Sequence, residues 1–250
     1  MKESFKDAAA KAELGPQEGV QVDDVDSSAA IALRGAMALG QITGEIDVRD
    51  FKLPRLNIAY GVGKFVGKFN PGSLVMGDDN LLVNVNTPLT VTILSAVKYW
   101  KEWINNAQWR AGIKPRVFMT GKEVLAVGGT TDYGADGTPP SFAPAMDLKL
   151  LIQKPTDISC GLFGVDLPDG VYAPAIWTVD KTAYKRVGPV VLSTQEFALR
   201  KRGLISGVFE LKTVVEKIRQ SNVVVPNIRM VAHRNDEFIE NLKRVFGDVK

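Results

Sequence analysis

Short hydrophobic runs separated by turn-forming residues dominate the chain from Phe51 onward. Gly, Pro, Asn and Asp interrupt the apolar runs at close intervals, and this spacing favours an antiparallel sheet or barrel over repeated βαβ units. The runs expected to form strands are LPRLNIAY, KFVGKF, GSLVMG, LLVNV, LTVTILSAVKYW, RVFMT, EVLAV, MDLKLLIQ and YAPAIWTV. We therefore predict a β-rich domain over residues 51–233. The later run PVVLSTQEFALRKRG is more ambiguous than the other runs as a strand.

The C-terminal end combines two further patterns. Residues 207–217 and 223–233 flank the polar stretch RQSN and are expected to pair as a hairpin, with Pro226 at an edge or bulge. Residues 234–250 then form an amphipathic helix. Asn235 is a plausible N-cap, acidic residues follow it, basic residues lie near the end, and apolar residues recur at helical spacing.

Two segments depart from the β pattern. Residues 1–50 contain helical stretches around the acidic, turn-rich sequence GPQEGVQVDDVDSS, so we predict an acidic, partly mobile helical arm. Residues 126–144 are rich in Gly, Pro, Thr and Asp, which predicts a long exposed loop.

Charge is distributed unevenly along the chain. Residues 1–50 carry 5 Lys/Arg against 10 Asp/Glu, and residues 181–250 carry 14 against 7, within an overall net charge of +3. The basic C-terminal part indicates a surface that binds a polyanion, and the acidic N-terminal part indicates a segment that competes for this surface. Ordinary solvated charge explains the same counts.

The low counts of cysteine and histidine limit the kinds of disulfide, metal site and catalytic site that the chain can form. One cysteine, Cys160, permits no internal disulfide, and one histidine, His233, leaves zinc sites and catalytic triads short of ligands. No apolar run approaches the ~20 residues that a membrane helix needs, and no signal sequence opens the chain. We expect a cytoplasmic protein that is not an enzyme and needs no cofactor, metal or membrane. A metal-dependent nuclease built from scattered carboxylates is the enzymatic alternative.

The segment YGVGKFVGKF, residues 60–69, resembles a phosphate-binding loop only superficially. In the Walker pattern, Gly67 and Lys68 would need a following Ser or Thr, and Val62 occupies the place of the first glycine. The dinucleotide pattern requires a glycine where Val66 stands. With a period of two, the lysines fall on one face and the phenylalanines on the other. This predicts either a half-buried strand or a strand that lies along nucleic acid.

Aromatic and basic residues are interleaved a second time in VKYWKEWINNAQWRAGIKPR, residues 97–116. Tryptophan offers a flat apolar face that pairs well with cations, which is typical of binding surfaces, although a core cluster under a loop fits equally. A third basic group lies in ALRKRG. The candidate nucleic-acid-binding residues are Lys64, Phe65, Lys68, Phe69, Lys98, Tyr99, Trp100, Lys101, Trp103, Arg110, Arg200, Lys201 and Arg202.

The series FKLPRLNIAYGVGKF, FNPGSLVMG, VKYWKEW and VVLSTQEFALRKRGLISG resembles the single-stranded DNA-binding proteins in replication and recombination cassettes of tailed bacteriophages. The resemblance covers roughly residues 51–233. It implies an oligonucleotide/oligosaccharide-binding (OB) β-barrel with added helices, which binds single-stranded DNA without sequence preference. Many such proteins end in an acidic tail, whereas this chain ends in RVFGDVK.

Two functions therefore stay open. The first is single-stranded DNA binding in replication or recombination, with replication or recombination proteins and a homo-oligomer as further possible partners. The second is a phage structural or assembly protein without nucleic-acid chemistry, in which the acidic arm and its small-residue helix make subunit contacts.

Overall fold

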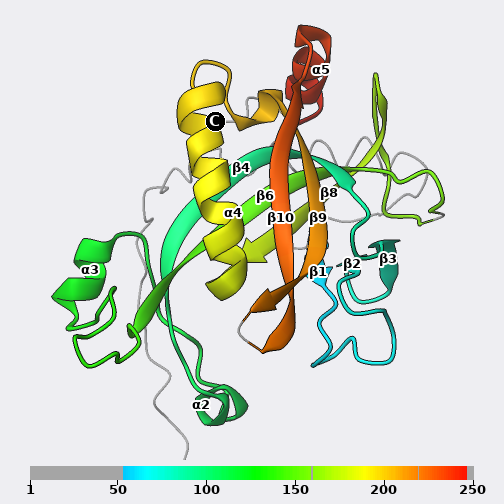
Figure 1. Ribbon diagram of the computed structural model, residues 1–250. Helices are drawn as coiled ribbons and strands as arrows, with labels where there is room; N and C mark the ends of the chain where they lie inside the picture. Colours follow the sequence, from blue (N-terminus) through cyan, green and yellow to red (C-terminus); the bar gives the residue numbers. More distant parts are fainter. Residues whose placement is uncertain (1–52, 159, 219, 247–250) are drawn as a thin grey trace, which may run out of the picture.

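The computed structural model describes residues 53–158, 160–218 and 220–246, so the predicted arm over residues 1–50 lies outside the described part. The described chain is mainly β, with antiparallel sheets and few helices, as the sequence predicts. Figure 1 shows a large, strongly bent sheet with a small sheet beside it and helices on its two faces.

The large sheet has the strand order β10-β9-β4-β6-β8-β7, with β5 paired to the far end of β4. All of its pairings are antiparallel. Its strands are β4 (Leu89–Glu102), β5 (Val117–Phe118), β6 (Phe142–Gln153), β7 (Val165–Leu167), β8 (Gly170–Val179), β9 (Gly207–Ile218) and β10 (Ser221–His233). The predicted hairpin is confirmed as β9 and β10, and Pro226 lies on the edge strand β10.

The small sheet consists of β1 (Leu56–Ile58), β2 (Leu74–Met76) and β3 (Asn80–Val83) in the order β1-β2-β3. A bridge between Arg55 and Ile176 joins its start to β8. On its other side, the Thr213 hydroxyl donates a hydrogen bond to the Gly72 carbonyl, and the Asn86 N–H donates to the Thr213 carbonyl at 2.8 Å. The two sheets flank one core, but the described strands form no closed barrel.

Gly72 is required where the two sheets meet. Its φ of +93° lies in a region that L side chains rarely adopt, and a Cβ there would lie 2.9 Å from Val85. Only glycine therefore lets the chain pass this close to Thr213 of β9.

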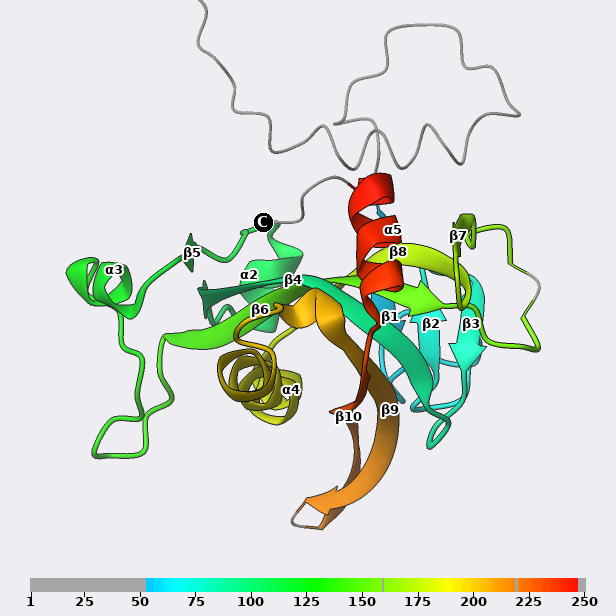
Figure 2. The same ribbon diagram turned by 90° about the horizontal axis from the view of Figure 1, so that it is seen from above.

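The helices are α2 (Asn106–Arg110), α3 (Gly121–Ala126), α4 (Lys181–Ser193) and α5 (Asp236–Phe246), with a π-helical turn at Thr194–Ala198 and a 3₁₀ turn at Leu204–Ser206. Helices α4 and α5 cover opposite faces of the large sheet, whereas α2 and α3 lie beyond it. Figure 2 shows the sheet bent around α4, with α5 on the opposite side.

The alternation of side chains along β6 explains this arrangement. Met146, Leu148, Leu150 and Ile152 point into the core that α4 and the small sheet share, whereas Leu151 points the other way, into the cluster under α5. Each fully buried side chain of this size contributes about 1.5 to 3 kcal/mol. Both faces of the central strand are therefore apolar, and each needs a covering element.

Helix α5 is the predicted terminal helix. Its first turn is capped as expected, because the Phe238 N–H donates to Asn235 Oδ1 at 2.8 Å. Phe238 and Leu242 are buried against Tyr172. Arg234 precedes the helix and is itself buried, where it pairs with Asp169.

Three local expectations need correction or completion. Residues 64–69, KFVGKF, form a turn and not a strand, because glycines with positive φ at Gly63 and Gly67 interrupt extended backbone. EVLAV lies in α3 and the following turn, because Thr120 and Glu123 form a capping box. The ambiguous run 189–203 continues α4, enters the π turn and ends in irregular chain.

Candidate nucleic-acid interface

The predicted binding residues lie in three separate parts of the molecule. Residues 64–69 lie between β1 and β2, residues 98–110 extend from β4 into α2, and residues 200–202 follow α4 and its π turn. In Figure 1, α2 lies at the bottom, the small sheet at the right, and the chain after α4 at the top. The residues therefore do not line one shared channel.

The first group segregates its lysines and phenylalanines as expected, but through a turn. The Phe69 N–H donates to the Phe65 carbonyl at 3.2 Å, so residues four apart lie on the same side. Phe65 is 6% exposed and packs with Phe69 against the small sheet. The Phe65 ring therefore has no free face on which a base could stack.

The lysines of this turn are already paired. Lys64 Nζ lies 2.5 Å from Asp78, and Lys68 pairs with Asp79, both acids coming from the turn between β2 and β3. The hydrogen bond and charge of Lys64 lower the pKa of the Asp78 carboxyl below its ordinary value. A phosphate would have to compete with two carboxylates here.

The second group splits between the two faces of β4. Alternation puts Lys98 and Trp100 on the face shared with Met146, and Tyr99 and Lys101 on the other face. Trp100 is half-buried; Lys98 Nζ lies 5.8 Å from its ring centroid, and Gly121 packs against the indole. Trp100 therefore supports the attachment of α3 and exposes only part of its ring.

Tyr99 is structural. It is 8% exposed, and its hydroxyl donates to Asp147 Oδ1 at 3.1 Å. Burial, followed by the charge of Asp147, raises the pKa of the Tyr99 phenol, so the side chain stays neutral at ordinary pH. The Asp147 carboxylate also accepts a hydrogen bond from Thr178 at 2.6 Å, which ties β4, β6 and β8 together.

Beyond the end of β4, two tryptophans border a pocket of about 280 Å³. Trp103 is 54% exposed and Trp109 is 66% exposed. Cationic side chains lie beside them: Lys181 Nζ is 4.4 Å from the centroid of the Trp103 ring, and Lys101 also lines the pocket. Arg110 follows Trp109 at the exposed end of α2. We call this the Trp103 pocket.

Asp180 and Lys181 link the Trp103 pocket to the start of α4. Asp180 occupies the N-cap position, but its side chain makes no cap hydrogen bond and instead accepts from Lys101 Nζ at 2.8 Å. Lys181 has a φ of +51°, a conformation that costs about 1 to 2 kcal/mol for a residue other than glycine. Such strained residues often occur at functional sites.

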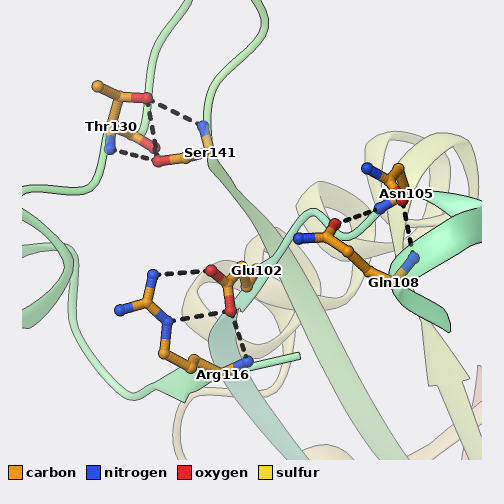
Figure 3. A network of polar contacts seen from close by, with 6 residues as sticks. All are labelled: Glu102, Asn105, Gln108, Arg116, Thr130 and Ser141. Atoms are coloured by element: carbon orange, nitrogen blue, oxygen red, sulfur yellow. Dashed lines mark hydrogen bonds and ion pairs between the residues drawn. The ribbon is translucent and has the colours of Figure 1, made fainter. Parts of the chain in front are cut away.

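Three polar contacts hold the chain around the pocket, as Figure 3 shows. Arg116 donates through its side chain and its backbone to Glu102, at 2.7 to 3.0 Å. Asn105 and Gln108 exchange two hydrogen bonds that cap α2. Thr130 and Ser141 bind each other across the base of the long loop, whose irregular course over residues 127–141 the sequence predicts. These hydrogen bonds therefore fix the chain segments that surround the Trp103 pocket.

The Glu102 carboxylate should make this part of the molecule sensitive to acid. Hydrogen bonds from Arg116 lower the pKa of Glu102. A carboxyl whose pKa is lower in the folded state stabilises the protein fully above its pKa in the unfolded state, which is about 4.3 for Glu. This stabilisation is lost as the pH falls through the pKa of the folded state. We expect Glu102→Gln to lose less stability than the wild type between about pH 6 and pH 2, measured by urea unfolding. Identical acid dependence of the two proteins would contradict this role.

The third group is exposed. Arg200 lies 3.5 Å from Glu196, one turn earlier, and Arg202 pairs with Asp236 at the start of α5. Lys201 forms no ion pair among the described residues. Residues 200–202 follow the C-terminal end of α4, whereas Lys181 of the Trp103 pocket begins the helix.

Sequence reasoning missed Lys181 as a site residue and placed Trp109 in the aromatic cluster without assigning it to the site. Asn105, which lies between Trp103 and Trp109, is a favoured N-cap residue type, and this signal could have placed both rings beside one turn. Nothing in the sequence pairs Trp103 with Lys181, because their contact depends on how β8 lies beside β6.

No protein-family model, curated protein sequence or solved structure matches this chain. The described helices include none with the length and apolar character needed to cross a membrane. Within residues 53–158, 160–218 and 220–246, no three His, Cys, Asp or Glu side chains gather to hold a metal ion.

Proposed function

We propose that this protein binds single-stranded DNA without sequence preference, in replication or recombination, and that the Trp103 pocket is the contact site. The observation that carries the proposal is the exposed Trp103 ring with a cation 4.4 Å from its centroid, beside the still more exposed Trp109. Stacking of bases on aromatic rings, combined with cations for the phosphates, is how proteins bind single strands regardless of sequence.

The start of α4 supports the same proposal. The side chain of its N-cap residue is engaged elsewhere, so it leaves first-turn N–H groups available beside Lys101 and Lys181. Helix N-termini favour phosphate because these donors and the helix dipole act together. A phosphate at this point would also compete with Asp180 for Lys101.

An OB-like arrangement is part of the proposal. The small sheet flanks the core of the large sheet and contacts both β8 and β9, so the strands surround a common interior. We infer that this is a divergent, incompletely closed relative of the OB barrel. The Trp103 pocket lies on the extension formed by β4, α2 and β6.

Fluorescence titration tests the function directly. We expect tryptophan emission to be quenched by oligo-dT and to recover as salt is added, because neutralised phosphates release counterions. For each phosphate contact, the slope of log K against log salt should be about −0.7. Duplex DNA of equal phosphate content should quench less, since its bases are not free to stack. Absence of quenching at low salt would refute the proposal.

Lys64 and Lys68 supply a matched control. Reversing their charge, as Lys64→Glu with Lys68→Glu, removes two cations that already face Asp78 and Asp79. Reversing Lys101, which pairs with Asp180, and Lys181 removes two cations beside exposed tryptophans. We expect the second pair to weaken oligo-dT binding more than the first.

A specific observation also favours the assembly function. Exposed apolar side chains gather on the extension near α2 and α3: Ile113, Val117, Met119, Leu125, Val127 and Tyr133. Such a concentration marks a contact surface for protein as well as for bases. An assembly protein would form large species by light scattering and show no response to oligo-dT.

A further inference from the structure

The outward face of α4 and the chain after it carry positive charge, most of which lies outside the Trp103 pocket. Residues 181–203 hold six basic residues against one acidic residue, Glu196, a net charge of +5. The basic residues, all exposed, are Lys181, Lys185, Arg186, Arg200, Lys201 and Arg202. Residues 181–250 carry a net charge of +7, so this segment supplies most of the basic excess of the C-terminal part.

Helix α4 connects the pocket to the far basic group. Its first residue, Lys181, contacts Trp103, and its 13 residues span about 20 Å at 1.5 Å per residue. Tyr184, Val187 and Val191 face the core, so Lys185 lies on the solvent side, one turn after Lys181.

An exposed aromatic ring follows the C-terminal end of α4. Phe197 is 84% exposed, more than any other large hydrophobic side chain of the described residues. It belongs to the π-helical turn Thr194–Ala198, and π turns occur frequently at functional sites. Arg200 and Lys201 follow it within one turn.

The competing acids are few. Arg186 pairs with Glu216, and Arg202 pairs with Asp236, but all four side chains are partly or largely exposed. Such exposed pairs contribute little to stability, but a phosphate would have to compete with these two acids, as it would at Lys64 and Lys68. Neither Lys185 nor Lys201 forms an ion pair among the described residues.

We propose that a single strand held at the Trp103 pocket continues along the outward face of α4 and stacks a base on Phe197. This path rests on the proposed function and extends it, because it assigns a length and a direction to the bound strand. At about 3.4 Å per phosphate of a stacked strand, 20 Å corresponds to roughly six nucleotides.

Oligonucleotides of two lengths test the path. Oligo-dT of about 3 nucleotides, about 10 Å long at the same spacing, should stay at the pocket, and oligo-dT of about 20 nucleotides should reach Phe197. We expect Phe197→Ala to weaken binding of the long strand about five- to 150-fold and to leave the short strand unaffected. Lys185→Glu with Lys201→Glu should reduce the magnitude of the salt slope for the long strand by about 1.4.

The matched control is Lys149→Glu with Lys154→Glu. Both lysines are exposed, and both lie on β6 or just beyond it, away from α4. This double variant has the same net charge as the α4 variant, so equal losses in the two would assign the effect to overall charge and overturn the path.

The outcomes separate the two proposals. Failure of the wild type to bind either strand would refute DNA binding itself. Normal binding of both strands by Phe197→Ala and by the α4 double variant would refute only the path. Vesicles of phosphatidylserine and phosphatidylcholine in equal parts form the third arm. If the α4 variants lose vesicle binding but retain all oligo-dT binding, this face contacts membranes and the path is wrong.

Discussion

Trp103→Ala and Trp109→Ala should each weaken oligo-dT binding by about 1 to 3 kcal/mol, or roughly five- to 150-fold in Kd. Both rings are more than half exposed, so their removal leaves no buried cavity. Stability to urea should therefore change by less than about 1 kcal/mol. Anisotropy of a labelled oligo-dT measures the affinity without depending on the tryptophans themselves.

Trp100→Ala is the matched control. The Trp100 ring is half-buried against Gly121 and lies on the other face of β4. We expect this variant to lose more stability and less affinity than the other two. Equal loss of affinity in all three, in proportion to lost stability, would mean that the exposed tryptophans act only through the fold.

Replacement of Arg234 should have the largest effect on stability. The guanidinium lies 4.1 Å from the Phe238 ring centroid, pairs with Asp169, and donates two hydrogen bonds to Thr92 at 3.0 and 3.2 Å. Arg234 is 7% exposed. Breaking a buried pair typically costs about 3 to 5 kcal/mol, and the partly exposed Asp169 favours the lower end. We expect Arg234→Ala to lose about 3 kcal/mol.

Urea unfolding measures this loss, and Arg229→Ala provides the comparison. Arg229 pairs with Glu210 at 2.7 Å, but its side chain is 67% exposed, so its removal should cost about 0 to 1 kcal/mol. Arg234→Lys should not restore stability, because an ammonium group does not lie flat between rings as a guanidinium does. A loss below about 1 kcal/mol for Arg234→Ala would show that α5 is held by its apolar face alone.

Much of the fold follows from sequence because local signals and tertiary packing agree. The β9-β10 hairpin and helix α5 each carry apolar residues on one face and polar residues at their ends. The first part of α4, residues 181–188, is not among the predicted elements, and the ambiguity of the run 189–203 has a physical reason. Val190 and Val191 favour strands, and Pro189 lies inside the helix, so packing on the sheet overrides the intrinsic preference.

The candidate site was harder to predict. In residues 64–69, a period of two and a helical turn place the same lysines together, so the pattern alone does not distinguish a strand from a turn. The partners Asp78 and Asp79 lie in a separate turn. Trp103 meets Lys181 only because β4, β6 and β8 are neighbours. Contacts across 78 positions in sequence have no local signature.

Hydrogen bonds between segments far apart in the sequence, including the one that joins the small sheet to β9, affect how fast the chain folds. The hydrogen bond from Thr213 to Gly72 spans 141 positions, and those from Arg234 to Thr92 span 142. Such distant pairings require the entropy of a long loop to be lost before any contact compensates for it, which slows folding. The N-terminal strands of the described chain consequently emerge from the ribosome well before their partners exist, and their apolar faces stay uncovered until β9 and Arg234 have been synthesised.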